Sequence, residues 1–478
     1  MVRTRFAPSP TGYMHIGNLR TALYSYMIAK RHQGRFVLRI EDTDMKRFEP
    51  GAMQEIYGSL RLAHLEYDEG PDKDGGFGPY IQSQRVSIYR RHIECLLEQG
   101  AAYPCFCTSA RTEQRRKGQK TYALGPDPCR FLDKAEVSAR VAGGEPHVVR
   151  QKIPEKGTTT VVDHVFGKIT VSNDTLDDQV LLKSDGFPTY NFANVVDDHL
   201  MEISHVVRGV EYLSSVPKYN LLYLTFGWGI PEYVHLPHIT KESGKKLSKR
   251  AGDASFQDLV ARGYLPEALV NYIALLGWNP GDEREFFLLT DLVAAFDVHR
   301  INKSSAAFSF EKLDWLNGEH VRRLSADQFH EAALAYYPGD IADTLDTQKI
   351  SRIIQPRVAK LSDIPHMVSF LARMPPYSLD LYNFKSDSTE ETSRWVLENV
   401  YPILSRVQVW TNEALYHELA AFATAASLKI RTVMWPLRIA LSGSMITAGG
   451  ATEIAEIIGR EETLRRLADA IGYLTASC

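Results

Sequence analysis

Residues 5–18, close to the amino terminus, combine residue types that can hold a phosphate group. A loop that leads into a helix directs free backbone N–H groups and the positive end of the helix dipole at one spot, which attracts anions. His15 and Asn18 would add hydrogen-bond donors there, and Gly17 has no side chain to keep a ligand from the backbone. The alternative is an ordinary turn in which His15 only caps the helix.

The flanking residues predict the elements that would position this loop. Residues 2–7 are partly apolar and indicate a strand, whereas residues 19–29 have apolar side chains at helical spacing and contain neither Pro nor Gly. Pro8 and Pro10 lack amide donors and keep the chain extended between the two elements, and Gly12 permits a turn. The predicted order is therefore strand, tight loop, helix.

A second charged cluster follows the next predicted strand. Residues 35–40 are apolar and β-rich, as in a buried strand of a parallel sheet. They are followed at the carboxyl end by Glu41, Asp42 and Asp44, and α/β sheets bind ligands at that end. Charges at the end of a strand are also common in solvated loops, which is the alternative here.

A basic loop lies between Gly244 and Gly252. Residues 246–250 read Lys-Leu-Ser-Lys-Arg, and the two glycines allow hinged motion. Lysines on such a loop can close on phosphates and stabilise the charge that develops in a transition state. The alternative is a solvated charge run.

These stretches resemble the signatures of the class I aminoacyl-tRNA synthetases. The run Pro-x-Pro-Thr-Gly-x-x-His-Ile-Gly-Asn that ends at Asn18 resembles the first signature, and residues 246–250 resemble the second in its glutamyl form. The run Arg-Ile-Glu-Asp-Thr-Asp at residues 39–44 is similar to the glutamyl and glutaminyl pattern.

The resemblance implies a role for each matching residue. It implies ATP contacts by Pro10, Gly12, His15, Gly17, Ser248 and Lys249. It implies catalytic roles for His15, Asn18, Lys246 and Lys249. It implies glutamate contacts by Arg5, Ala7, Ser9, Glu41, Tyr190, Asn194 and Arg208. In this family Glu41 would face the ammonium group.

Arg208 carries the prediction of substrate specificity. Residues 203–209 indicate a strand with Arg208 at its carboxyl end, and an Arg can hold a carboxylate through two parallel hydrogen bonds. Tyr190 and Asn194 are four residues apart on a predicted helix and would share a face. A core Tyr, a capping Asn and a salt-bridged Arg are the structural alternatives. Because glutamine has no charge for Arg208 to bind, we expect glutamate to be the substrate.

Three of the five cysteines could bind zinc. Cys105, Cys107 and Cys129 have a spacing that permits tetrahedral coordination, and some glutamyl enzymes have such a site. The usual fourth ligand is absent, because Phe131 stands at its position; Tyr122 is a substitute at a different spacing. A zinc site and a zinc-free hairpin both stay open. The odd, sparse set of cysteines favours a reducing compartment over a disulfide framework.

Length and composition set further limits. A chain of 478 residues is expected to form several domains, because single cores rarely exceed about 250–300 residues. The net charge of −3 neither supports nor excludes nucleic acid as a partner. The sequence has no run of about 18 apolar residues and no basic segment followed by an apolar core. We therefore expect no membrane span and no signal peptide, and a cytoplasmic location.

The predicted fold is α/β, with a Rossmann-type parallel-sheet catalytic domain, an inserted acceptor-binding domain and an all-helical anticodon-binding domain. The predicted boundaries are 1–84 with 201–255 for the split catalytic domain, 85–200 for the insertion, which ends by returning to the core, 256–325 for a helical stem-contact domain and 326–478 for the anticodon domain. Helical patterns lie near residues 326–336, 347–372, 389–406, 412–439 and 452–475. The resemblance aligns Arg357 with an Arg that reads the last anticodon base.

The resemblance as a whole implies glutamate–tRNA ligase activity in protein synthesis. It implies L-glutamate, ATP and tRNA(Glu) as partners, Mg²⁺ with the ATP, and a monomer. Three alternatives are a glutaminyl enzyme, a paralogue that modifies a tRNA base and a tRNA-binding protein that has lost catalysis. The helical carboxyl half weighs against the first two, and the two intact signatures weigh against the third.

Overall fold

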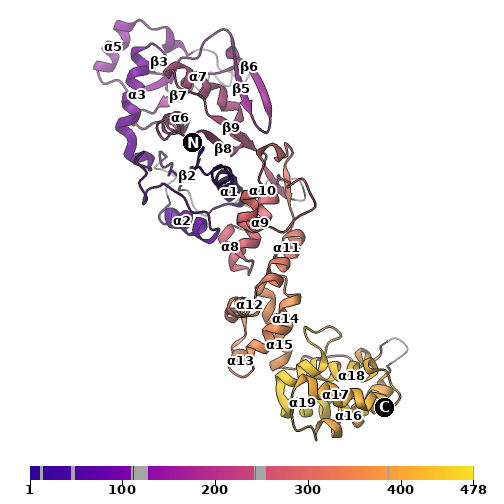
Figure 1. Ribbon diagram of the computed structural model, residues 1–478. Helices are drawn as coiled ribbons and strands as arrows, with labels where there is room; N and C mark the ends of the chain where they lie inside the picture. The colour runs from indigo at the N-terminus through magenta and orange to yellow at the C-terminus, as the bar shows by residue number, and fades with distance from the viewer. Residues whose placement is uncertain are drawn as a thin grey trace. The chain divides into compact units, whose positions relative to one another are not determined.

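A computed structural model describes residues 1–10, 14–44, 49–108, 111, 127–241, 243, 255–384 and 388–476. The chain divides into two compact units (Figure 1). The first contains Met1–Leu259 and Pro266–Phe310, and the second contains Val260–Leu265 and Glu311–Cys478. Each unit is described by itself.

The first unit is built on a six-stranded sheet. Its strand order is β2-β1-β8-β9-β5-β6, with bounds Arg35–Leu38, Arg3–Phe6, His205–Gly209, Glu232–Leu236, Thr158–Asp163 and Gly167–Ser172. All neighbouring strands are parallel except β5 and β6, which form an antiparallel hairpin. The parallel arrangement places the carboxyl ends of β1, β2, β8 and β9 at one edge of the sheet, where ligands bind in such folds.

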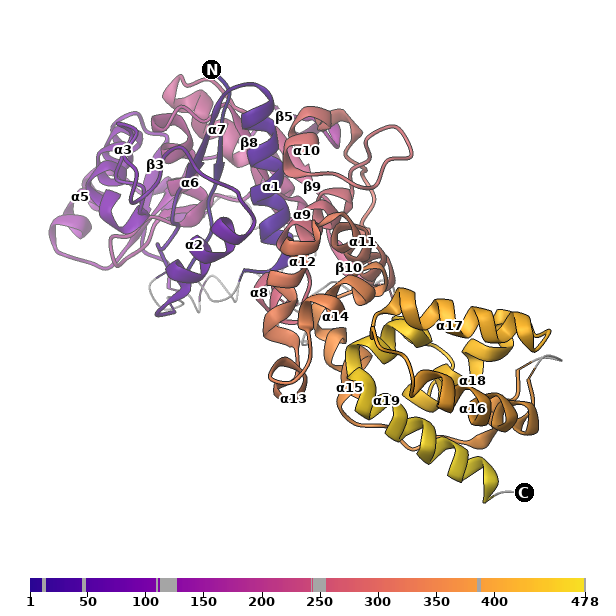
Figure 2. The same ribbon diagram turned by 60° about the horizontal axis from the view of Figure 1, so that its bottom comes forward.

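Helix α1 (Ile16–Arg31) forms as predicted from its apolar spacing. Leu19, Leu23 and Met27 recur every fourth residue and are fully buried, so one face of the helix packs on the unit's interior. The helix contacts β1, β2 and β8 as well as α9 (Pro266–Leu275) and α10 (Leu289–Ala295), and Figure 2 shows it along β8. The packing fixes the start of α1 near the carboxyl ends of the strands.

The remaining elements of the first unit surround this sheet. A three-stranded antiparallel sheet has the order β3-β4-β7, with bounds Ala102–Cys105, Val148–Gln151 and Val180–Leu182. A short parallel pair joins β10 (Ile239–Lys241) to β11 (Ala306–Phe308). The other helices are α2 (Ala52–Leu62), α3 (Val86–Glu98), α5 (Lys134–Ala142), α6 (Tyr190–Leu200) and α7 (Val216–Phe226). Helix α8 (Phe256–Ala261) includes the point in the sequence where the units divide.

The β-rich segment at residues 144–170 is shared between two sheets. Its first strand, β4, pairs with β3 and β7, whereas β5 and β6 extend the sheet that contains β1. The alternation of apolar and polar residues in this segment is typical of half-buried strands. Periodicity reports which face of a strand is buried but not which strand is its partner, so the assignment to two sheets needed the structure. The predicted domain boundaries stay a prediction.

The second unit is helical. Its helices are α11 (Phe310–Arg323), α12 (Ala326–Ala333), α13 (Gly339–Ala342), α14 (Thr347–Ile354), α15 (Ile364–Ala372), α16 (Glu390–Leu404), α17 (Asn412–Ala425), α18 (Ile430–Ser442) and α19 (Ala451–Thr475). Helices α16, α17, α18 and α19 contact one another in a bundle (Figure 1). The parallel sheet and this helical carboxyl half confirm the predicted fold class.

Three of the expected helical pieces are interrupted, and the one at 452–475 is kinked at Gly459, whose φ of 80° and ψ of 172° are not helical. The piece at 347–372 changes to a 3-10 turn at Gln355–Arg357, because Pro356 lacks the amide hydrogen that would continue α14. The piece at 412–439 ends its first helix at Ala425, and Ser427 takes a positive φ before α18 begins. Arg357 therefore lies on a 3-10 turn between helices rather than within one.

Candidate active site

A cavity of about 410 Å³ lies at the carboxyl ends of β1, β8 and β9. Residues from both halves of the sequence line it. The predicted residues among them are Arg5, Ala7, Ser9, His15, Gly17, Asn18, Glu41, Tyr190 and Arg208. Parallel strands direct residues from positions far apart in the sequence to one edge of a sheet, so the cavity collects them.

One side of the cavity rests on a buried ion network around Asp198. Arg39 donates to Asp198 Oδ1 at 2.7 Å and to Glu41 Oε1 at 2.9 Å. Arg5 donates its Nε hydrogen to the same carboxylate at 3.0 Å and an Nη1 hydrogen to the carbonyl of Val207 at 3.1 Å. Burial raises the pKa of Glu41, and the two arginines act against that rise. The network thus holds Arg5 and Glu41 in place at the cavity wall.

Arg208 is one of the buried cations that line the cavity. Its side chain lies over the rings of Tyr212, Tyr219 and Tyr233, with its central carbon 4.8 Å from the centroid of Tyr219. Among the described residues no carboxylate lies within salt-bridge distance of this guanidinium, and its Nη2 atom is buried without a hydrogen-bond partner. A buried charge is costly unless it is paired, so this group is suited to an anionic ligand.

His235 and Asp163 lie behind Arg208. Arg208 donates its Nε hydrogen to His235 Nε2 at 3.1 Å, and His235 Nδ1 lies 2.7 Å from Asp163 Oδ2. Asp163 ends β5 and also accepts the N–H groups of Val165 and Phe166. Burial lowers the pKa of His235, and the cations Arg208 and Arg5 lower it further, whereas Asp163 raises it.

The start of α1 provides the anion-binding end of the cavity. His15 is the N-cap of α1, and its Nδ1 accepts the N–H of Gly17 at 3.0 Å. A neutral imidazole whose Nδ1 accepts carries its proton on Nε2, which is then a donor. Capping and anion binding are therefore compatible roles for His15, although the sequence presented them as alternatives. A side chain at Gly17 would crowd this cap, because a Cβ there would lie 3.3 Å from His15 Nδ1.

Several predicted residues lie elsewhere. Pro10 and Asn194 do not line the cavity; Asn194 is buried on α6 and donates to the carbonyl of Tyr190 at 2.8 Å. The predicted ATP-binding and catalytic residues outside the described part of the chain are Gly12, Lys246, Ser248 and Lys249.

Sequence reasoning missed other lining residues. These are Arg20, Thr21, Glu211, Tyr212 and His238, together with apolar residues of strand ends. Arg20 of α1 donates to the carbonyls of Leu276 and Pro237, so it joins α1 to the chain segments that follow α9 and β9. His238 follows the end of β9, so its position after an apolar strand was a signal that could have found it.

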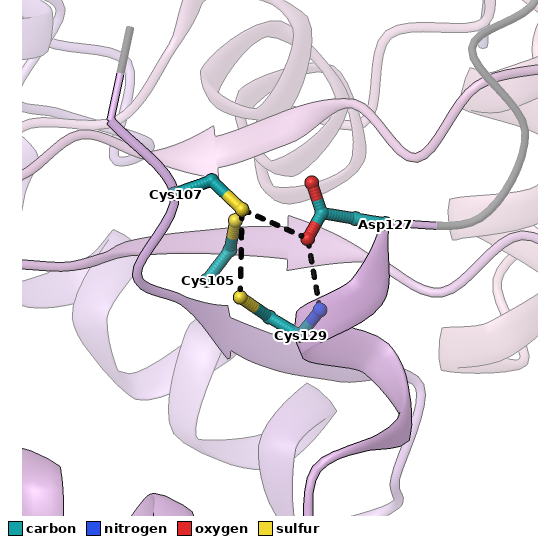
Figure 3. Close-up of side chains that lie close together, drawn as sticks. All are labelled: Cys105, Cys107, Asp127 and Cys129. Atoms are coloured by element: carbon teal, nitrogen blue, oxygen red, sulfur yellow. Dashed lines mark hydrogen bonds between the residues drawn. The ribbon is translucent and has the colours of Figure 1, made fainter. Parts of the chain in front are cut away.

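A separate cluster of three thiols and a carboxylate lies near β3 (Figure 3). Ligand atoms of Cys105, Cys107, Asp127 and Cys129 all lie within 4.8 Å of one another. Cys107 Sγ is 3.7 Å from Cys129 Sγ and 3.5 Å from Asp127 Oδ1. Asp127 was not predicted as a member of this cluster, and Tyr122 lies outside the described residues.

Comparison with known proteins identifies the family. A family model described as the catalytic domain of class I tRNA synthetases (E and Q) matches residues 1–315, and one described as an anticodon binding domain matches residues 328–471. The chain is 52% identical over 470 residues to a glutamate–tRNA ligase of Clostridium tetani, covering 98% of this chain and 96% of the relative. The chain belongs to the glutamate–tRNA ligase family of class I tRNA synthetases. A glutamate–tRNA ligase of Clostridium botulinum strain Hall is 51% identical over 479 residues, 99% of each chain.

Solved structures of this family share the whole fold. A crystal structure of a glutamate tRNA ligase from Elizabethkingia meningosepticum, in complex with its amino acid, has a TM-score of 0.86 at 34% identity and covers 99% of both chains. A glutamate–tRNA synthetase from Elizabethkingia anophelis has a TM-score of 0.87 at 34% identity, covering 98% of this chain and 99% of that one. These matches confirm the predicted family, its ligase activity and its place in protein synthesis.

Arg357 lies within the segment that matches the family's anticodon binding domain. It is exposed on the turn Gln355–Arg357 and donates to the carbonyl of Thr447. Arg438 lies close to it: burial lowers the pKa of Arg438, and the charge of Arg357 lowers it further. Two cations of this chain are thus near enough within the matched segment to influence each other electrostatically.

Among the described residues, no helix combines the length and the apolar character that a membrane crossing requires.

Proposed function

We propose that this chain activates L-glutamate with ATP and transfers it to the 3′ end of tRNA(Glu). The observation that carries the choice of amino acid is Arg208, a buried guanidinium in the cavity with an unpartnered Nη2 and no carboxylate partner among the described residues. A glutamate γ-carboxylate would supply the missing anion. Glutamine would leave the charge unpaired, and leaving a buried polar group without a partner is what gives a site strong discrimination.

The remaining glutamate contacts follow from the cavity wall. Glu41 would accept the ammonium group, and its position is fixed by Arg39. Tyr190, Ser9 and Arg5 also line the cavity and would hold the rest of the amino acid. Arg5 is anchored by Asp198 through Nε and Nη2 and by the carbonyl of Val207 through Nη1, so its positive charge stays in place at the cavity wall.

The first step is adenylate formation. The glutamate α-carboxylate would attack the α-phosphorus of ATP in line, forming a phosphorus–oxygen bond as the bond to pyrophosphate breaks. The start of α1 and His15 would hold the phosphates, and Lys246 and Lys249, which lie outside the described residues, would stabilise the charge that builds up. Positioning of this kind is worth about 7–11 kcal/mol in well-oriented reactions.

Magnesium would reach the site with ATP. The only carboxylates that line the described cavity are Glu41 and Glu211, and Glu41 is already paired with Arg39. That donor set fits an ion held chiefly by ATP phosphates and water rather than by a protein cage, which is usual for Mg²⁺ at nucleotide sites. The ion would neutralise phosphate charge.

The second step transfers the glutamyl group. A ribose hydroxyl of the terminal adenosine of tRNA would attack the carbonyl carbon of the mixed anhydride, and AMP would leave with the electron pair of the broken bond. No nucleophile from the chain is needed.

Arg357 would read the anticodon from the second unit. We expect the enzyme to act as a monomer in the cytoplasm, where tRNA is charged.

We also propose that zinc binds to Cys105, Cys107, Cys129 and Asp127. With zinc–sulfur bonds of about 2.3 Å and a zinc–oxygen bond of about 2.0 Å, a tetrahedral site requires about 3.8 Å between sulfurs and about 3.5 Å between sulfur and oxygen. The separations of 3.7 Å between Cys107 Sγ and Cys129 Sγ and 3.5 Å between Cys107 Sγ and Asp127 Oδ1 fit these edges. Four protein ligands leave no open position, so the ion would stabilise the fold near β3 and take no part in the reaction.

The deciding experiment is glutamate-dependent exchange of pyrophosphate into ATP, with and without tRNA(Glu). We expect exchange with glutamate and none with glutamine at the same concentration. Exchange with glutamine would overturn the role given to Arg208. Tight binding of tRNA without exchange under any condition would instead favour a tRNA-binding protein that has lost catalysis.

A further inference from the structure

We propose that His235 and Asp163 are positioning residues that hold Arg208 in the orientation that selects glutamate. This inference rests on the proposed function, because it assigns Arg208 to the γ-carboxylate. The three side chains come from three neighbouring strands: Asp163 from β5, His235 from β9 and Arg208 from β8. Neither Asp163 nor His235 lines the cavity, so both would act only through Arg208.

The contacts form a continuous buried chain. The side chains of His235 and Asp163 are fully buried, and Arg208 is 5% exposed. Asp163 Oδ2 lies 2.7 Å from His235 Nδ1 and also accepts the backbone N–H of His235 at 3.1 Å. His235 Nε2 accepts from Arg208 at 3.1 Å. Asp163 is itself fixed, because its Oδ1 accepts the N–H groups of Val165 and Phe166.

The chain of contacts sets the tautomer of His235. Arg Nε always carries a hydrogen, so His235 Nε2 must accept and the imidazole proton must lie on Nδ1. The Asp163 carboxylate favours that tautomer, because it can only accept. The groups facing the ring are Asp163, Arg208 and the cation of Arg5, and burial together with the two cations keeps the ring neutral.

The contact also decides how a ligand can approach. An Arg can bind a carboxylate side-on, through Nε and Nη2, or end-on, through both terminal nitrogens. His235 occupies the Nε side of Arg208, which leaves the end-on approach. Tyrosine rings also lie near the guanidinium, but among the described residues its one side-chain hydrogen bond is the bond to His235. His235 is therefore the hydrogen-bond partner that fixes the orientation of the guanidinium plane.

Two substitutions of His235 separate the effect of its hydrogen bond to Arg208 from the effect of its side-chain size. Asn places an amide near the position of Nδ1, so His235→Asn keeps a donor for Asp163 and loses the acceptor for Arg208. Gln reaches the position of Nε2, so His235→Gln keeps an acceptor for Arg208. We expect His235→Asn to raise KM for glutamate by about 10-fold or more, with kcat and KM for ATP nearly unchanged, and His235→Gln to stay near the wild type.

Asp163→Asn tests the second link. The new amide would present a donor to the ring and favour the opposite tautomer, as a carboxylate-to-amide change does in other carboxylate–histidine pairs. We expect KM for glutamate to rise and the preference for glutamate over glutamine to fall. His205→Asn is the matched control, because His205 lies on β8 and contacts Glu232 rather than Arg208. Its kinetics should match the wild type.

A spectroscopic measurement keeps the test independent of folding and of the proposed function. The wild-type enzyme is labelled with ¹⁵N only at histidine and studied by NMR. The His235 signal is the one that is absent from the spectrum of His235→Gln. We expect this signal to show the imidazole proton on Nδ1. A proton on Nε2, or equal KM for the Asn and Gln variants, would overturn the inference. Absence of glutamate-dependent exchange in the wild type would overturn the proposed function instead, and the tautomer would still be measured.

Discussion

Arg39 donates to Asp198 at 2.7 Å in a contact that water hardly reaches, since the exposed fractions of the two side chains are 0% and 2%. Arg5 shares the same carboxylate at 3.0 Å. Asp198 therefore bridges two buried cations next to the cavity, and Arg39 has Glu41 and Asp197 as further anionic partners. Removal of a partner from such a network leaves a charge buried without compensation, which costs far more than the loss of a surface pair.

Asp198→Asn should destabilise the enzyme by about 3–5 kcal/mol, because Arg5 loses its carboxylate partner and Arg39 loses one of its three. It should also raise KM for glutamate, since Arg5 and Glu41 depend on this network for position. The stability change is measured by urea unfolding followed by circular dichroism. Asp282→Asn is the control: Asp282 is paired with Arg284 at 2.8 Å on the surface of the same unit, and its loss should leave the unfolding midpoint unchanged. Equal midpoints for the two variants would contradict the role of Asp198.

Arg208→Gln should raise KM for glutamate by about 30-fold or more, because the γ-carboxylate would enter a buried site without its partner. Its thermal stability should equal or exceed that of the wild type, since the guanidinium is buried in the free enzyme without a carboxylate. Pyrophosphate exchange and thermal unfolding measure the two effects. Arg284→Gln, an exposed Arg of the same unit, should change neither. A variant with unchanged KM would remove Arg208 from the glutamate site.

Purified enzyme should contain one zinc ion per chain, and Asp127→Asn should weaken its retention by about 10-fold or more against a chelator. Asn is as good an N-cap as Asp, so this variant keeps the cap of the short helix Pro128–Phe131 and removes only the anionic ligand. Asp133→Asn is the control, because Asp133 caps α5 in the same way and lies outside the thiol cluster. Zinc content is measured by mass spectrometry of the dialysed proteins. Full retention by Asp127→Asn would exclude the carboxylate as a ligand.

His320 should make the second unit less stable in mild acid. Burial lowers the pKa of His320 to about 4 in the folded chain, whereas an unfolded chain has a His pKa near 6.5. The unfolded state therefore binds more protons between these values, so the contribution of His320 is complete above about pH 6.5 and is lost as the pH falls towards 4. At pH 7 the wild type should unfold at a higher urea concentration than His320→Gln. Near pH 4.5 the two urea midpoints should be closer together. The exposed His417 is the control, and His417→Gln should follow the wild type throughout.

Several features of the molecule were determined by the sequence alone. The apolar spacing and the prolines around residues 8–29 predicted β1, the loop and α1 in order, because short-range sterics and hydrogen bonding set such elements. The motif residues predicted fewer than half of the residues that line the cavity, and these lie near the ends of strands or the start of a helix. The helical character of the carboxyl half was also readable, although the break at Pro356 was missed.

Only the tertiary structure decided which distant residues act together. Asp163 lies in the segment predicted as part of an insertion, yet β5 joins the central sheet. This pairing brings Asp163 into contact with His235, which contacts Arg208. Asp198 follows an apolar helical run, and nothing local shows that it will compensate Arg5 and Arg39. Asp127 precedes Cys129 by two residues and faces the thiols only because the strands bring Cys105 and Cys107 to it. Periodicity determines local conformation, whereas strand pairing and the need to compensate buried charge act between residues far apart in the sequence.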